Sequence, residues 1–162
     1  MGTALLAQVE ETETPDEEIA SLLGQYATCL ESRGVDQWLE LFVDECQFRV
    51  FSLDFHTYET LTLLIQCSGR TGLEDMLKKA SEEMPNSRHV CSTPSWVRRV
   101  DGDLEVRTNF VVHQSTAFGQ VKLFAVGQYR DVLTRSAGLL RFRQRDVVVD
   151  ACGAPENISV PL

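Results

Sequence analysis

Apolar residues recur at helical spacing in the first third of the chain. After Thr14-Pro-Asp-Glu17, which has the spacing of a capping box with proline at the first helical position, the apolar side chains from Ile19 to Leu30 lie three or four residues apart. This pattern predicts a helix from residue 15 that ends near Gly34, because glycine is favoured just beyond a helix. Asp36 is then placed to cap a short second helix.

The middle of the chain combines strand and helix signals. Residues 46–51 alternate between polar and apolar and are rich in aromatic side chains, and residues 60–67 are rich in threonine and leucine, so both segments are predicted strands. Thr71-Gly-Leu-Glu74 repeats the capping-box spacing and predicts a third helix, which Pro85 would close.

From residue 88 onward the apolar period is two. Segments 88–100 and 104–115 flank Asp101-Gly102-Asp103, a typical hairpin turn, and segments 121–133 and 139–150 are two further long strands. The order predicts an α+β fold, in which about three helices from the N-terminal half pack against a strongly curved, mostly antiparallel sheet. Such a sheet forms a cone that encloses a cavity.

Length and charge predict one domain and limit its partners. We expect an acidic, flexible N-terminal tail over residues 1–14 and a single cone-fold domain over residues 15–162. The net charge of −9 argues against nucleic acid as a partner, since phosphate binding needs a basic surface. No apolar stretch reaches the roughly 18 residues of a membrane span. Five cysteines without a C-x-x-C pair, and no basic signal-peptide start, favour the cytoplasm.

Recognisable metal and nucleotide motifs are missing from the sequence. His56, His89 and His113 are too far apart to form a helical metal-binding pair. A Rieske iron–sulfur cluster needs two cysteines and two histidines from two loops, and that pattern is not found. Glycine-rich nucleotide loops and the G-x-S-x-G element are not found either. We therefore expect no catalytic, cofactor-binding or metal-binding residues in this chain.

Acid–base chemistry inside the cone is the enzymatic alternative. His89 and His113 lie on neighbouring predicted strands, and Tyr26 and Asp36 come from the helices that would roof the pocket. The alternative is a stand-alone dehydratase or isomerase that uses His89 with His113 or Asp36. The structural interpretation makes Tyr26 a core aromatic, Asp36 an N-cap and His89 a sheet-edge residue held by backbone hydrogen bonds. A module that binds an apolar ligand in the cone is a third hypothesis.

The last strand carries residues that favour a protein partner. Arg141, Arg143 and Arg145 recur at every second position, which predicts a stripe on one face that is either solvated or part of a subunit contact. The three consecutive valines of Val147–Val149 place apolar side chains on both faces, so the outer face should be covered. Ile158–Leu162 adds a further apolar segment.

Five segments follow one another in a characteristic order. They are Asp36-Gln-Trp-Leu-Glu-Leu-Phe42, Ser87-Arg-His-Val90, Val106-Arg-Thr-Asn-Phe110, Leu123-Phe-Ala-Val-Gly-Gln-Tyr-Arg-Asp131 and Asn157-Ile-Ser-Val-Pro-Leu162. With these segments the chain resembles, over most of residues 17–162, the small (β) subunits of aromatic-ring-hydroxylating dioxygenases. It is most similar to members that act on aromatic carboxylates. It departs from many relatives at His113, where they carry tyrosine, and in the composition of residues 52–67.

The resemblance implies a nuclear-transport-factor-like cone fold, shared with SnoaL-like proteins. It also implies a hetero-hexamer, α3β3, in which this chain contacts the large (α) oxygenase subunit and other copies of itself. The Rieske iron–sulfur cluster, the mononuclear iron and the substrate pocket would belong to the large subunit, with electrons supplied from NADH through a reductase. The chain itself would be a non-catalytic, structural small subunit in the degradation of an aromatic compound.

Overall fold

The computed structural model describes residues 14–54, 56–57, 59–80 and 86–150. All but one residue of the predicted acidic tail fall outside these ranges, as do Pro85 and Ile158–Leu162. The division into a tail and one domain therefore stays a prediction, and so does the closure of the third helix by Pro85.

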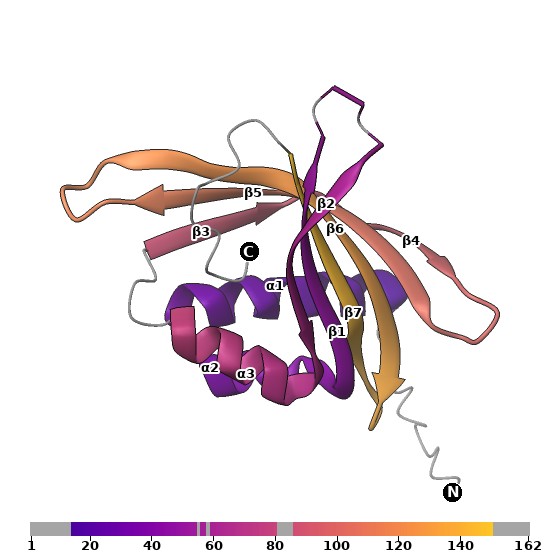
Figure 1. Cartoon of the computed structure of the whole chain (residues 1–162). Coiled ribbons are helices and arrows are strands. Elements are labelled where there is room, and N and C mark those ends of the chain that lie inside the picture. Colours follow the sequence, from indigo (N-terminus) through magenta and orange to yellow (C-terminus); the bar gives the residue numbers. More distant parts are fainter. Residues whose placement is uncertain (1–13, 55, 58, 81–85, 151–162) are drawn as a thin grey trace, which may run out of the picture.

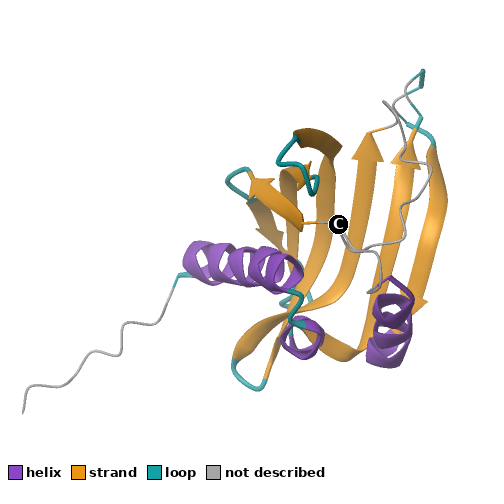
Figure 2. Ribbon diagram, turned by 90° about the vertical axis from the view of Figure 1, so that its left-hand side faces the viewer, coloured by secondary structure: helices purple, strands orange, loops and turns teal. Residues whose placement is uncertain are grey.

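The described residues form helices on one side of a curved sheet (Figures 1 and 2). In chain order the elements are α1 (Pro15–Ser32), α2 (Val35–Glu40), β1 (Phe42–Leu53), β2 (Leu61–Ser68), α3 (Gly69–Ala80), β3 (Asn86–Cys91), β4 (Ser95–Arg98), β5 (Leu104–Ser115), β6 (Val121–Ser136) and β7 (Leu139–Asp150). The strand order is β2-β1-β7-β6-β5-β3, with β4 beside β5. Only β1 and β7 pair in parallel among these strands, which confirms the mostly antiparallel α+β fold.

Helix α1 begins as the sequence predicts and ends one residue earlier than expected. The Glu17 amide donates to Thr14 Oγ1 at 3.4 Å and the Thr14 amide donates to Glu17 Oε2 at 2.8 Å, which completes the capping box. At the other end, Arg33 and not Gly34 takes the left-handed conformation, with φ of 60°. The Gly34 amide then donates to Cys29 O at 2.8 Å and closes the helix.

The predicted starts of the second and third helices are wrong by two and three residues, respectively. Helix α2 begins at Val35 with Gly34 as its N-cap. Asp36 therefore lies inside the first turn, where its negative charge interacts favourably with the helix dipole, and it is not the N-cap. Helix α3 begins at Gly69, before Thr71. Gly69 has a φ of +69°, which lets β2 turn directly into the helix.

The predicted strand over residues 88–100 is two strands, β3 and β4. Between them Ser92 pairs with Asn109 of β5, and its Oγ accepts from the Asn109 amide at 3.1 Å. Pro94 follows, and proline has no amide hydrogen with which to continue a ladder. The predicted hairpin at Gly102 is confirmed: Arg98 pairs with Leu104, and Gly102 has a positive φ of 92°.

A β-bulge on β7 reverses the direction of its side chains. Strand β6 pairs with Phe142 and, at its next position, with Gln144, so Arg143 is an extra residue on β7. As a result Phe142 and Arg145 both point inward and are fully buried, while Arg143 is exposed and Arg141 is half-buried. The predicted stripe of Arg141, Arg143 and Arg145 is therefore wrong, because one added residue moves Arg145 to the inner face.

The core lies between the helices and the inner face of the sheet. A chain of ring contacts joins α1 and α2 to β1 and β7, with centroid distances of 4.7 Å between Trp38 and Phe42 and 5.6 Å between Tyr26 and Phe142. On β5 the inner series from Leu104 to Val112 is buried at every second residue, as its alternation predicts. The packed aromatic core fills the inside of the curved sheet beneath α1.

Candidate functional site

The ring of His89 is buried against α1. His89 pairs with Val112 on the inner face of the sheet, and its side chain is 2% exposed. Its backbone amide donates to Glu31 Oε1 at 2.9 Å, as the structural interpretation expects. Nδ1 lies 3.7 Å from the same oxygen, beyond hydrogen-bond distance, and neither ring nitrogen has a hydrogen-bond partner among the described residues. Burial lowers the pKa of His89, Arg145 lowers it further and Glu31 opposes both, so the ring is neutral at pH 7.

The structure does not assemble the acid–base set of the enzymatic alternative. His113 pairs with Arg88, and the next pair along the two strands is His89 with Val112. Because successive pairs point to opposite faces of a sheet, the ring of His113 lies on the face opposite to that of His89. Asp36 lines a separate groove on α2. Tyr26 is in the core, where burial raises its pKa to about 12 although Arg145 opposes the shift.

A fully buried ion pair crosses β6 and β7 beneath α1. Arg145 Nε donates to Asp131 Oδ1 at 2.8 Å and Nη2 donates to Oδ2 at 2.7 Å, and both side chains are 0% exposed. The guanidinium carbon lies 3.9 Å from the ring centroid of Tyr26 and 4.1 Å from those of Tyr129 and Phe142. Despite burial, Asp131 holds the pKa of Arg145 above its usual value. The aromatic rings surround this pair, which indicates a structural role.

The sequence interpretation did not identify Asp131 as the buried partner of Arg145. Asp131 belongs to the inner series of β6, two residues after Tyr129 and two before Leu133, and all three are buried. A carboxylate in such a series is almost never buried without a partner. The alternation of β6 was therefore the available signal, but it could not show which arginine would pair with Asp131.

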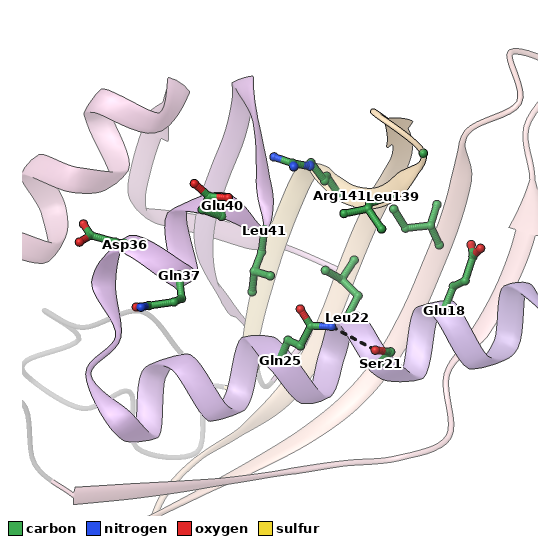
Figure 3. Close-up of a pocket in the computed structure, with 12 residues that line it drawn as sticks. Glu18, Ser21, Leu22, Gln25, Asp36, Gln37, Glu40, Leu41, Leu139 and Arg141 are labelled. Carbon is green, nitrogen blue, oxygen red and sulfur yellow. Dashed lines mark hydrogen bonds between the residues drawn. The ribbon is translucent and has the colours of Figure 1, made fainter. Parts of the chain in front are cut away.

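An acidic groove lies between α1, α2 and the turn that joins β6 to β7 (Figure 3). Its volume is about 480 Å³, and carboxylates of Glu18, Asp36 and Glu40 line it together with Arg141. Glu18 accepts from Arg135 Nη2 at 2.6 Å and is thereby held at one end of the groove. Neither histidine nor cysteine is among its described lining residues, so it offers no thiol nucleophile and no imidazole base that could activate the Ser21 hydroxyl, which accepts from Gln25 Nε2 at 3.1 Å.

A second groove, which we call the His89 groove, lies between α1 and the segment that joins β3 to β4. Its volume is about 530 Å³. Ala20 and Gly24 of α1 form one wall, Cys91 and Pro94 lie opposite, and His89 is part of the lining. Its lining is mostly apolar, and Asp16, Ser92 and Thr93 are polar lining residues in addition to His89.

The outer face of the sheet, opposite the helices, carries an apolar cluster where β3, β5 and β6 lie side by side, bordered by polar side chains such as Asn109 and Gln128. Val90, Val111 and Val126 are neighbours across these strands, and Val90 is 58% exposed. Together with Val148 of β7 they line a groove of about 540 Å³. Val148 points to this face while Val147 and Val149 belong to the core, which confirms the prediction of apolar side chains on both faces. Exposed apolar area of this kind is typical of a protein contact.

Leu123 and Val121 extend this apolar surface along β6. Leu123 pairs with His113 and Val121 with Ser115, and their exposed fractions are 59% and 66%. We call Val90, Val111, Val121, Leu123 and Val126 the outer apolar patch, beside which Val148 is itself only 2% exposed.

The described ranges contain neither a cluster of metal ligands nor a helix suited to span a membrane. Within residues 14–150, leaving out the gaps at 55, 58 and 81–85, His, Cys, Asp and Glu side chains nowhere gather in threes around a possible ion. In the same ranges, no helix combines the length and apolar character needed to cross a membrane.

Comparisons with known proteins agree with the cone fold and with a subunit role. Residues 13–146 match the family described as SnoaL-like domain. The beta 1 subunit of the terminal oxygenase component of terephthalate 1,2-dioxygenase from Comamonas sp is 26% identical, over 90% of this chain and 97% of that protein. The small subunit of anthranilate 1,2-dioxygenase from Burkholderia cepacia is 22% identical, over 90% and 92%.

A solved structure supports the same fold. It is a protein from Novosphingobium aromaticivorans assigned as the beta subunit of an aromatic-ring-hydroxylating dioxygenase. Its TM-score is 0.74 at 21% identity, with 83% of this chain and 88% of that chain covered. The resemblance to dioxygenase small subunits is thereby confirmed.

Proposed function

Because the chain belongs to the SnoaL-like domain family, we propose a specific role for it within a dioxygenase. It is the structural, non-catalytic small subunit of a two-subunit Rieske-type aromatic-ring-hydroxylating dioxygenase and supports the large catalytic subunit. The observation that carries this role is the alignment with two dioxygenase small subunits over 90% of the chain. The alignment also covers at least 92% of each relative, so the likeness extends to the whole subunit.

The proposal places the redox chemistry outside this chain. The Rieske cluster and the mononuclear iron belong to the large subunit, and a reductase supplies electrons from NADH. The substrate is an aromatic carboxylate, since the relatives are named for terephthalate and anthranilate, and both are aromatic carboxylates. The complex is an α3β3 hexamer in the cytoplasm, in which this chain also meets copies of itself.

The outer apolar patch is the surface that we assign to subunit contact. Val90 and Leu123 are both more than half exposed, and they lie on the face that the helices leave uncovered. Burying such side chains against a partner is favourable by about 25 cal/mol for each Å² removed from water.

Co-expression with the large subunit tests the role. We expect the two chains to purify together, with iron bound only when the large subunit is present, and the isolated chain to be free of iron and inactive. Stoichiometric iron in the isolated chain, or conversion of an aromatic substrate by it, would contradict the proposal.

A pair of variants tests the contact surface. Leu123→Glu places a charge in the outer apolar patch and should reduce the yield of complex, measured by size-exclusion chromatography with light scattering. Val100→Glu is the matched control, because Val100 is fully exposed beside the β4–β5 turn and lies outside the patch. Equal loss of complex in both variants, or no loss in Leu123→Glu, would show that the patch is not the contact.

A further inference from the structure

We propose that Arg107 and Arg130, which lie on the same face of the sheet as the outer apolar patch, bind a carboxylate of the large subunit. The segment of the large subunit that covers this face therefore carries an aspartate or glutamate side chain beside apolar residues. The inference rests on the proposed function, because it specifies the chemistry of the same subunit contact.

Arg107 and Arg130 lie directly opposite each other on β5 and β6. They are a pair in the strand register, and the next pair, Thr108 with Tyr129, is buried on the inner face, so the two arginines point outward. Arg107 is exposed and Arg130 is half-buried. The Cβ atoms of such a pair are about 4.5–5.5 Å apart, and like charges at this distance destabilise a sheet. A negative group placed between the two guanidiniums removes this repulsion.

The part of the chain that the structure describes gives neither arginine a carboxylate of its own. Asp146 lies opposite Arg130 on β7, but its two oxygens accept from Arg49 at 2.8 and 2.7 Å. Glu105, the preceding outer residue on β5, has its Oε1 3.8 Å from Arg99 Nε. The row of paired residues across β1, β7, β6 and β5 thus holds three guanidiniums and one carboxylate. This face has a local excess of positive charge, although the chain has a net charge of −9.

The guanidinium of Arg130 is held in place by neighbouring amides. Its Nε donates to Gln128 Oε1 at 3.1 Å, and Gln128 Nε2 donates to Asn109 Oδ1 at 3.2 Å. Its two terminal nitrogens have no hydrogen-bond partner among the described residues. A guanidinium positioned in this way is suited to a carboxylate, which it can bind through two parallel hydrogen bonds.

The outer apolar patch continues from the arginines along the same two strands. The next outer pair consists of amides, and the one after it is Val111 with Val126. Val111 follows Arg107 by four residues, which is about 13 Å along a strand. Arg130 and both valines also line the outer groove of about 540 Å³. The covering segment therefore presents a carboxylate about 13 Å from apolar side chains.

The large subunit is the occupant that we assign to this face. The relatives that align over the whole chain are the small subunit of one dioxygenase and a beta subunit of another, so a larger companion chain is expected. A second copy of this chain is less suited, because two chains that each carry a net charge of −9 repel each other. A partner with a local negative patch complements the arginines and is drawn towards them.

Charge reversal at Arg107 tests the contact in the complex with the large subunit. We expect Arg107→Glu to raise the dissociation constant by at least about tenfold, because the partner carboxylate then meets a like charge. Added salt should weaken the wild-type complex more than the variant complex. Lys122→Glu is the matched control: it makes the same charge change at an exposed residue of β6 whose side chain lies on the inner side of the sheet. It should leave the dissociation constant unchanged.

A second variant removes the half-buried charge without reversing it. Arg130→Gln keeps a hydrogen-bonding side chain and should also weaken the complex by about tenfold. Equal effects of Arg107→Glu and Lys122→Glu, or a dissociation constant that does not depend on salt, would overturn the inference and leave the subunit role intact. Self-association of the isolated chain that Arg107→Glu abolishes would also overturn it, since the carboxylate would then come from a second copy. If the wild-type chain forms no complex with the large subunit, the proposed function fails and this inference fails with it.

Discussion

Two arginine–aspartate pairs on β7 have the same geometry in opposite surroundings. Arg145 and Asp131 meet on the inner face of the sheet, with Nη2 and Oδ2 at 2.7 Å. Arg49 and Asp146 meet on the outer face, also at 2.7 Å and also through two hydrogen bonds. Arg145 and Asp146 are consecutive residues, so the alternation of one strand separates the two pairs.

The surroundings of the two pairs set their energetic weight. The inner pair is 0% exposed on both sides and lies among three aromatic rings, whereas the outer pair is 33% and 14% exposed. Water solvates an outer charge that loses its partner, but it cannot reach an inner one. Identical distances therefore do not imply equal contributions to stability. Each variant below alters a group on either the inner or the outer face of the sheet, so that the two faces can be compared.

The largest effect is expected from breaking the inner pair. Asp131→Ala leaves the Arg145 guanidinium buried without a counter-charge, which should lower the free energy of unfolding by about 3–5 kcal/mol. Chemical denaturation of the full chain measures this. A loss below about 1 kcal/mol, the ordinary value for an exposed pair, would mean that water reaches Arg145.

Removing both charges together should restore much of that loss. Asp131→Leu combined with Arg145→Met replaces the pair by apolar side chains in an apolar site. We expect the double variant to be more stable than Asp131→Ala by about 3 kcal/mol or more, because breaking a buried pair is costly whereas replacing it by apolar side chains is close to neutral. The same denaturation experiment reports it. A double variant no more stable than Asp131→Ala would show that the aromatic rings require the guanidinium for their packing.

A pH effect of intermediate size is expected from His89, which also lies on the inner side. Its pKa is lowered by burial, so the unfolded chain binds this proton more readily than the folded one. The stability linked to His89 is present above its unfolded pKa of about 6.5 and is lost as the pH falls through that value towards the folded pKa. His89→Phe should flatten the pH dependence of the unfolding free energy in this window, and an unchanged slope would assign it to other groups.

The smallest effect is expected from the outer pair. Arg49→Ala should lower the free energy of unfolding by about 0.2–1 kcal/mol, and less at high salt, because solvent screens the charges of partly exposed pairs. Denaturation at two salt concentrations tests this. A loss equal to that of Asp131→Ala would remove the distinction between the two faces.

The success of sequence interpretation differs between the helix ends and the strands. The capping box at Thr14 was predictable because both partners lie within one turn. The starts of α2 and α3 were not predictable, because Gly34 caps α2 and Gly69 begins α3, in place of the nearby polar residues Asp36 and Thr71. The conformations of these glycines depend on the path of the preceding chain. Among the candidate site residues, the burial of Tyr26 was expected, but the opposite directions of His89 and His113 follow from a register that the sequence does not display.

Periodicity, caps and turn residues determined from the sequence alone that helices come first, that long alternating strands follow and that the fold is α+β. These signals are local, because each depends on residues within a few positions. The tertiary structure alone decided which face receives Arg145, since the bulge at Arg143 is set by pairing with β6. It also decided that Asp131 is the partner of Arg145 and that His89 lies against Glu31 of α1, because side chains distant in sequence meet only after the sheet has curved around the helices.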